Sequence, residues 1–178
     1  MYRNRLIFSV LFTVGLAANS WALRSDRQQP IDIKADRVEI DERTQVSHYY
    51  GNVRMEQGSL KIRAEEVVVY LQDGSLYKIV IFGKPARFEQ QPDDKKTVVE
   101  SRAEHMEYFA SKQLLVLRRN AEVTQGPNLF RGELIEYDTL KSTVRATKGE
   151  GSDTRVHAII KPASDKEDDA PPTDADKP

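Results

Sequence analysis

The segment that decides the fold is Gly51-Asn-Val-Arg-Met-Glu-Gln-Gly58, in which apolar and polar residues alternate between two glycines. Successive side chains of a β-strand point to opposite faces, so this alternation predicts a strand with one apolar face. A related segment, Arg119-Asn-Ala-Glu-Val-Thr-Gln-Gly126, occurs later in the chain. Because the two segments share their pattern, we expect them to occupy equivalent places in two halves of the protein.

A shorter motif recurs around these segments: a small residue, an acid, and then two apolar positions spaced by two. Its copies are Ala35-Asp-Arg-Val-Glu-Ile40, Ala64-Glu-Glu-Val-Val-Val69, Ala103-Glu-His-Met-Glu-Tyr108 and Gly132-Glu-Leu-Ile-Glu-Tyr137. A repeat of this kind indicates stacked units that share a continuous core. The body of the chain is therefore expected to be two related halves, residues 29–90 and 97–161.

Further short segments with strand patterns are separated by turn signals, which favours a sandwich, a barrel or a jelly roll. They are residues 31–35, 60–64, 66–71, 79–82, 121–123, 144–146 and 156–160. The strand at 79–82 is predicted to stop at Gly83-Lys-Pro85. Residues 103–117 also fit a helical stripe, but they contain a copy of the repeat, so we interpret them as strand. The fold class predicted is all-β.

The two ends of the chain differ from this body. Residues 1–22 combine Arg3 and Arg5, an apolar run over 6–18 and small residues at 20 and 22, the pattern of a cleaved signal peptide. Residues 162–178 contain four Pro and six Asp or Glu, and no apolar residue larger than Ala, which predicts a disordered acidic tail. One domain, residues 23–161, is expected between them.

The composition of the chain excludes several classes of partner and of chemical site. The chain has 27 Lys and Arg against 28 Asp and Glu, which argues against nucleic acid as the main partner. The absence of Cys excludes disulfides, thiol catalysis and zinc–thiolate sites. His48, His105 and His157 are widely separated, so we expect no metal, no cofactor and no catalytic site. We interpret Lys34, Arg37, Arg54, Lys61 and Arg63 as charges of the polar face, with contact to the phosphates of a ligand as the alternative.

Alternation along the strands also predicts which side chains face inward. They form either a solid core or the lining of a groove, and the residues alone favour the core. The set is Ile31, Ile33, Val38, Ile40, Val53, Met55, Ile62, Val67, Val69, Phe88, Met106, Tyr108, Leu115, Leu117, Val123 and Ile135.

These motifs together resemble the OstA-like family of lipopolysaccharide transport proteins. The repeat unit, the Gly-Asn-Val strand and the following Arg63-Ala-Glu65 are similar to that family's repeat, and Gly83-Lys-Pro-Ala-Arg-Phe88 is similar to another of its elements. Gln29-Pro-Ile-Asp-Ile-Lys-Ala-Asp36 resembles the start of the mature proteins. The resemblance covers nearly all of 28–161. It departs at Arg119 and Ala121, which replace Gly and Val, and at Gly132, which replaces Ala.

The resemblance implies an open, V-shaped antiparallel β-jellyroll and a carrier that bridges the inner and outer membranes through the periplasm. Most of the inward residues would then line an apolar groove for the acyl chains of lipid A. The implied partners are lipopolysaccharide, an LptC-like inner-membrane protein, an LptD–LptE-like outer-membrane complex and further copies of the chain, head to tail. Energy would enter elsewhere, because the chain has no nucleotide-binding motif.

An unclosed jellyroll exposes strand edges at which a neighbouring chain can add a strand. The edge residues predicted to pair with a neighbour are Ile31, Asp32, Ile33, Lys34, Val156, His157 and Ile159. The alternative is a structural scaffold that polymerises in the same way with a solid interior and no lipid cargo. An exported polysaccharide-modifying enzyme is a third class, for which the sequence shows no clustered acids or nucleophile.

Overall fold

The computed structural model describes residues 26–91, 97–149 and 155–161. The predicted signal peptide, residues 1–22, and the predicted acidic tail, residues 162–178, lie outside the described residues. Among the described residues, no helix is long and apolar enough to cross a membrane.

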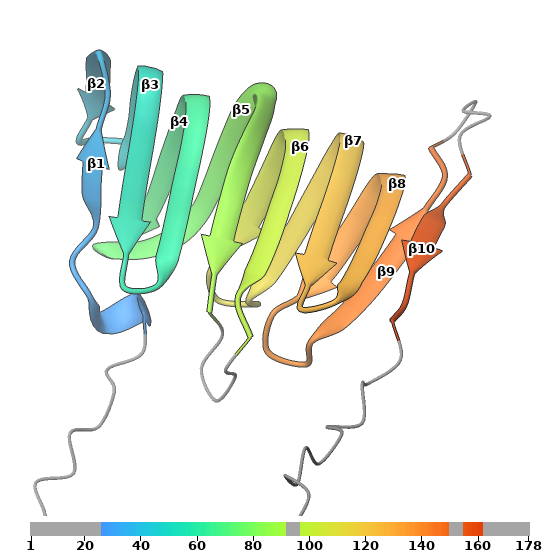
Figure 1. Ribbon diagram of the computed structural model, residues 1–178. Coiled ribbons are helices and arrows are strands. Elements are labelled where there is room, and N and C mark those ends of the chain that lie inside the picture. The colour runs from blue at the N-terminus through green and yellow to red at the C-terminus, as the bar shows by residue number, and fades with distance from the viewer. Residues whose placement is uncertain (1–25, 92–96, 150–154, 162–178) are drawn as a thin grey trace, which may run out of the picture.

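Within the described ranges, ten strands form one antiparallel sheet, which confirms the all-β prediction (Figure 1). A single turn of 3-10 helix, η1, precedes them. The hydrogen-bonded order is β1-β3-β4-β5-β6-β7-β8-β10, with β2 beside β3 and β9 beside β8. The elements are η1 (Asp26–Gln28), β1 (Asp32–Lys34), β2 (Arg37–Asp41), β3 (Val46–Gln57), β4 (Leu60–Gln72), β5 (Ser75–Gln90), β6 (Val99–Phe109), β7 (Leu114–Gln125), β8 (Asn128–Asp138), β9 (Thr143–Thr147) and β10 (His157–Ile159).

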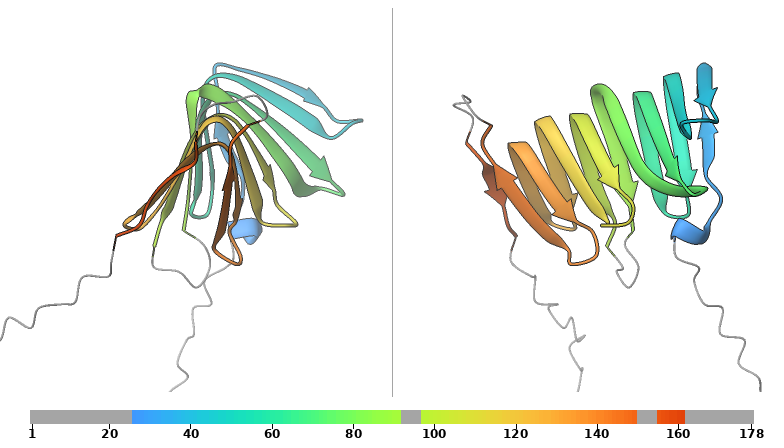
Figure 2. Two further views of the ribbon diagram at one scale, coloured as in Figure 1. Left: turned by 90° about the vertical axis from the view of Figure 1, so that its right-hand side faces the viewer. Right: turned by 180° about the vertical axis from the view of Figure 1, so that it is seen from behind.

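The sheet is folded along a line that crosses every long strand, so that it has two legs, as the end-on view in Figure 2 shows. We call leg A the part built from 37–50, 66–82, 105–118 and 134–147. Leg B is built from 32–34, 53–63, 86–90, 99–102, 121–131 and 157–159. Each pairing of long strands shifts register where the legs meet, for example between Tyr50 and Val53. Such irregularities bend strands sharply, and here they produce the V shape.

Two pairs of residues with left-handed backbone stand at this bend, one in each half. Gly51 and Asn52 have φ of 76° and 46°, and Arg119 and Asn120 have φ of 62° and 53°. The Asn52 side-chain amide donates to the Asp36 carboxylate at 2.9 Å. The Asn120 amide likewise donates to a carboxylate, that of Glu104 at 2.6 Å. The bend is therefore built in the same way in both halves of the chain.

The duplication inferred from the sequence extends to whole strands. Strands β3 and β7 begin and end at equivalent positions of the two copies, and β4 and β8 begin at equivalent positions as well. At the two ends of the sheet a bent strand is divided into two short ones: β1 and β2 correspond to β6, and β9 and β10 correspond to β5. If each divided strand is counted once, the sheet consists of two copies of a four-strand unit. This agrees with the predicted halves.

One predicted boundary is wrong. The strand that starts before Ile79 does not stop at Gly83-Lys-Pro85, because β5 continues to Gln90. The pairing of β5 with β6 shifts between Phe82 and Ala86, so the turn-forming residues are accommodated as the bend of a longer strand. The ambiguous residues 103–117, in contrast, lie in strands β6 and β7 and the turn that joins them, which bears out the strand interpretation.

Candidate functional site

The inner surface of the V is a continuous apolar face. In an antiparallel sheet, residues directly opposite each other share a face. In leg A one such row runs Val38, Tyr49, Val67, Ile81, Met106, Leu117, Ile135 and Ala146. In leg B the corresponding row runs Ile33, Met55, Ile62, Phe88, Ser101, Val123, Phe130 and Ala158. The rows join all the strands, and apart from Ser101 their side chains are apolar from one end of the sheet to the other.

Most residues predicted to face inward belong to one buried cluster between the legs. Two more, Ile31 and Ile33, are partly buried and pack against it. The Phe88 and Tyr108 rings, from leg B and leg A, have centroids 5.4 Å apart and so connect the two inner faces. The buried members are Val53, Met55, Ile62, Val67, Val69, Phe88, Met106, Tyr108, Leu115, Leu117, Val123 and Ile135.

Val38 and Ile40 are 50% and 63% exposed, unlike the other residues predicted to face inward. Their register still places them on the inner face, where Val38 pairs with Tyr49 and Ile40 with Ser47. They lie in β2, which pairs only with β3 among the described strands, so no further strand covers them. The apolar face is therefore open to solvent at this end of the sheet.

The sequence reasoning also missed part of the core. Leu60, Ile79, Ile81 and Tyr137 are fully buried on the inner face but are not in the predicted inward set. Alternation within their strands would have identified them. Val68, Val80 and Val116 are buried on the outer face of leg A. Each is the middle residue of three consecutive apolar residues, a pattern that indicates burial on both faces of a strand. On that outer face the Phe82 and His105 rings stack at 4.8 Å.

A hollow of about 570 Å³ lies where the tips of the two legs face each other. Its lining includes Ile31, Leu60, Leu76, Tyr108 and Ala110, and polar residues of both tips. A volume of this size falls within the range of about 300–1,000 Å³ that is usual for ligand pockets. The hollow connects the inner apolar face to solvent along the side of the V.

The short helix η1 borders this hollow and is held by one carboxylate. Asp26 accepts hydrogen bonds from the Ser59 backbone N–H at 2.6 Å, the Ser59 hydroxyl at 2.7 Å and the Gln90 side-chain amide at 3.0 Å. The N-terminal part of the fold is thus fixed to the tip of leg B, beside the mouth of the hollow.

Both ends of the sheet present strands with one partner strand among the described residues. At the first end these are β1 and β2, and at the other they are β9 and β10. The predicted edge residues lie there: Ile33 pairs with Met55, and His157 pairs with Arg131. Exposed apolar side chains occur at each end, with Val156 at 40% and Ile159 at 39% exposed beside β8.

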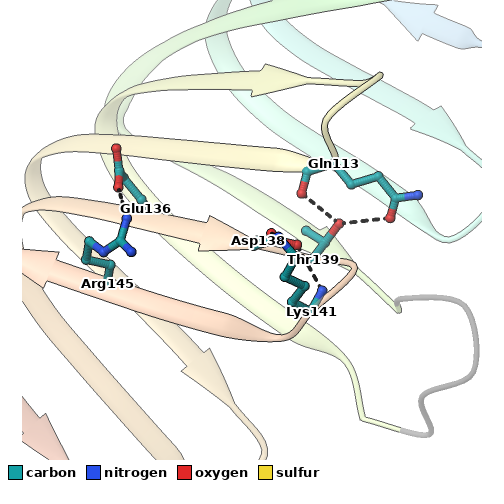
Figure 3. A network of polar contacts seen from close by, with 6 residues as sticks. All are labelled: Gln113, Glu136, Asp138, Thr139, Lys141 and Arg145. Carbon is teal, nitrogen blue, oxygen red and sulfur yellow. Dashed lines mark hydrogen bonds and ion pairs between the residues drawn. The ribbon is translucent and has the colours of Figure 1, made fainter.

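The turn that leads into β9 is fixed by polar contacts (Figure 3). Thr139 donates its backbone N–H and its hydroxyl to the Gln113 carbonyl oxygen, at 2.9 Å and 3.1 Å, which joins the β8–β9 turn to the β6–β7 turn. Asp138 accepts from the Lys141 N–H at 2.9 Å, and Arg145 of β9 pairs with Glu136 of β8 at 3.4 Å. These contacts hold the last strand of leg A in a defined position.

The titratable groups form no cluster suited to a metal ion among the described residues. No three His, Asp or Glu side chains there are placed to hold a metal ion. Burial, reinforced by Arg118 and Arg119 and opposed by Glu107, lowers the pKa of His105 below its ordinary value. His105 is therefore neutral at neutral pH and packs as an aromatic ring on the outer face.

Comparison with known proteins gives consistent results. Residues 32–143 match the family described as LptA/(LptD N-terminal domain) LPS transport protein. The chain is 35% identical over 163 residues to the lipopolysaccharide export system protein LptH of Pseudomonas aeruginosa, covering 88% of this chain and 93% of LptH. It is 34% identical over 165 residues to LptA of Escherichia coli K12, covering 90% and 88%.

The architecture agrees with these sequence matches. The crystal structure of Pseudomonas aeruginosa LptH, the LptA-homologous periplasmic component of a lipopolysaccharide transport device, superposes with a TM-score of 0.71 at 35% identity. The match covers 78% of this chain and 99% of the LptH chain. The chain therefore belongs to the LptA/LptD N-terminal domain family of lipopolysaccharide transport proteins.

Proposed function

We propose that this protein carries lipopolysaccharide through the periplasm, with the acyl chains of lipid A against the inner face of the V. The observation that carries the proposal is the apolar inner face, which extends through all strands and is open at the end formed by Val38 and Ile40. Each acyl methylene exposed to water costs about 0.8 kcal/mol, so a carrier needs continuous apolar cover.

The hollow between the leg tips is the proposed point of entry. The inner side chains are packed against one another in the structure, so acyl chains must replace contacts between the legs with contacts to lipid. The side of the V that contains the hollow is already open and includes Tyr108. Sugars attached to acyl chains in this position would remain in water outside the leg tips.

The proposed function includes export of the chain and its head-to-tail assembly with further copies. Residues 1–22 would direct export of the chain to the periplasm and would then be removed. An edge formed by β9 and β10 would add to the β1 and β2 edge of a further copy, so that the inner faces become continuous. An LptC-like protein at the inner membrane and an LptD–LptE-like complex at the outer membrane would occupy the remaining edges. The relatives are transport proteins, and we assign no enzymatic step to this chain.

Photocrosslinking in cells tests the cargo and the face together. A photoreactive residue in place of Tyr108 is expected to capture lipopolysaccharide, because Tyr108 is buried on the inner face and lines the hollow. The same residue in place of Glu107 is the matched control, because Glu107 pairs with Val80 on the outer face. Capture at Glu107 alone would contradict the assignment of the inner face.

The scaffold alternative predicts a different result in the same experiment. A scaffold would be exported, folded and assembled, and neither position would capture lipid. The comparisons do not favour this alternative, since the named relatives are lipopolysaccharide export proteins. If neither the Tyr108 variant nor the Glu107 variant captures lipid, although both are exported and folded, the scaffold function would be favoured over the carrier function.

A further inference from the structure

The outer face of leg B carries a row of basic side chains that crosses the strands. The register places Arg54, Arg63, Arg87 and Arg102 directly opposite one another on β3, β4, β5 and β6. We call these four residues the arginine row. Like charges directly opposite on neighbouring strands destabilise a sheet, so three such pairs in succession require a source of compensating charge.

Only one end of the arginine row is compensated by the described residues. Glu122, on β7, accepts from the Arg102 guanidinium at 2.8 Å and from the Arg131 guanidinium at 2.6 Å. The side chains of Arg54, Arg63 and Arg87 are exposed and make no hydrogen bond or ion pair with any described residue. The uncompensated part of the row is thus the part on β3, β4 and β5.

The surface beside the row can accept a ligand. A hollow of about 220 Å³ is lined by the bases Lys61, Arg63, Arg87 and Arg102 and by the acids Glu89, Glu100 and Glu122. Glu56, Glu89 and Glu100 flank the row, each two residues from it along its strand, and Glu89 pairs with Lys61 at 3.9 Å. Among the described residues no ion pair joins these three acids to Arg54, Arg63 or Arg87. The flanking acids therefore leave the three guanidinium groups available to other carboxylates.

We propose that the acidic C-terminal segment, residues 162–178, folds back and binds the arginine row through carboxylate–guanidinium pairs. The segment has six Asp or Glu and two Lys. It follows directly on the same leg, where the Lys161 N–H donates to Asn128 of β8 at 3.3 Å. Leg B also has more basic than acidic residues, whereas leg A does not, so charge and position favour the same surface.

The chain length permits this contact. Strands lie about 4.8 Å apart, so six spacings separate β10 from β3 by roughly 29 Å. Residues 162–178, fully extended, span up to about 56 Å. The run of four acids within residues 165–169 begins close enough to the exit point to reach β6, β5 and β4. A tether of this length gives an effective concentration in the millimolar range, so weak pairs suffice.

The experiment uses the absence of Cys from the chain. A single Cys in place of Ala170 carries a nitroxide, and amide signals of the isotopically labelled full-length exported protein report its position. At low salt we expect strong broadening in β3 and β4 around Arg54 and Arg63. Broadening there should be lost at about 0.5 M salt, where the Debye length is only about 4 Å.

Two variants separate the proposal from simple proximity. Replacing Arg54, Arg63 and Arg87 by Gln should abolish the broadening in β3 and β4, while the dispersion of the amide spectrum shows that the fold is retained. The matched control replaces three bases on the outer face of leg A, Lys78, Arg118 and Arg145, by Gln as well. It should leave the broadening unchanged. Broadening that survives high salt and the arginine variant would overturn the proposal.

A mixture of nitroxide-labelled and isotopically labelled chains tests whether the row binds the acidic segment of a second copy instead. Broadening that appears only between chains would assign the row to the segment of a second copy and would likewise overturn the intramolecular contact. None of these outcomes depends on lipid capture at Tyr108, so failure here leaves the proposed carrier function untouched.

Discussion

At the scale of single residues, the bend of the V depends on left-handed backbone that the two halves supply differently. Gly51 adopts φ of 76° without penalty, whereas its counterpart Arg119 must adopt φ of 62°. A left-handed conformation costs an L-residue with a side chain roughly 1–2 kcal/mol. The second half of the duplication therefore carries strain at the position where its sequence departs from the repeat.

We expect Arg119→Gly to stabilise the protein by roughly 0.5–1 kcal/mol, because glycine removes this strain at a smaller entropic cost. The ion pair of Arg119 with Glu104 is long at 3.7 Å and exposed, so its loss matters little. Chemical denaturation measures the change. Arg118→Gly is the control, since Arg118 has ordinary strand backbone, and it should destabilise by about 0.5–1 kcal/mol.

A second residue-scale prediction concerns acid stability. Burial raises the pKa of Glu122, but hydrogen bonds and charges from Arg131 and Arg102 outweigh burial and hold that pKa below its ordinary value of 4.5. A carboxyl with a lowered folded-state pKa stabilises the protein above its unfolded-state pKa, and this contribution is lost as pH falls through the folded value.

We therefore expect Glu122→Gln to cost about 1–2 kcal/mol at neutral pH, and the cost to shrink as pH falls below 4.5. Denaturation midpoints measured from about pH 7 to about pH 3 test the trend. Glu100→Gln serves for comparison, because Glu100 is an exposed acid on the same face. A pH-independent loss for Glu122→Gln would show that shape, and not charge, explains its contribution.

At the scale of elements, the position of a strand in the sheet determines what its apolar residues contribute. Val38 and Val67 lie in the same inner row, separated only by Tyr49. Val67 is fully buried because strands cover it on both sides, whereas Val38 is half exposed in β2. Identical side chains on one face thus experience different environments at the end and in the middle of the sheet.

We expect Val67→Ala to destabilise the isolated protein by about 1.5–3 kcal/mol through lost burial and a residual cavity. Val38→Ala should change stability by less than about 0.5 kcal/mol, as is usual for exposed positions. Thermal and chemical denaturation at low protein concentration compare the two. Equal losses would mean that the end of the sheet is covered in solution.

Much of this element-scale organisation could be predicted from the sequence, because alternation and the internal repeat depend on local chemistry. The repeat assigned residues 103–117 to strands when periodicity alone was ambiguous. The continuation of β5 through Gly83-Lys-Pro85 could not be predicted, since the same residues also form turns. The exposure of Val38 depends on the number of strands beyond it, which no local pattern contains.

At the scale of the whole molecule, the sheet has two ends at which apolar residues meet water. Ile40 is 63% exposed at the first end, on the inner face. A second copy that adds its β9 and β10 edge there would cover this residue and make the apolar interior continuous. Assembly by this route depends on apolar contact at the end of the V as well as on backbone pairing.

We expect Ile40→Asp to shift the protein toward monomers, by about tenfold in dissociation constant for each 1.4 kcal/mol of lost contact. Sedimentation velocity over a range of concentrations measures the shift. Val98→Asp provides the control, because Val98 is also exposed, at 38%, but lies at the tip of leg B. Equal effects of both substitutions would contradict assembly through the ends of the sheet.

The terminal strands also determine how the molecule responds to mechanical load. Each end of the sheet is held by eight registered residue pairs, five from one short strand and three from the other, whereas β3 and β4 share ten. A pulling force along the long axis of the sheet is transmitted from strand to strand in series, so the joint with the fewest hydrogen bonds yields first. Under tension the short strands at the two ends would detach first, while the long strands in the middle of the sheet stay paired.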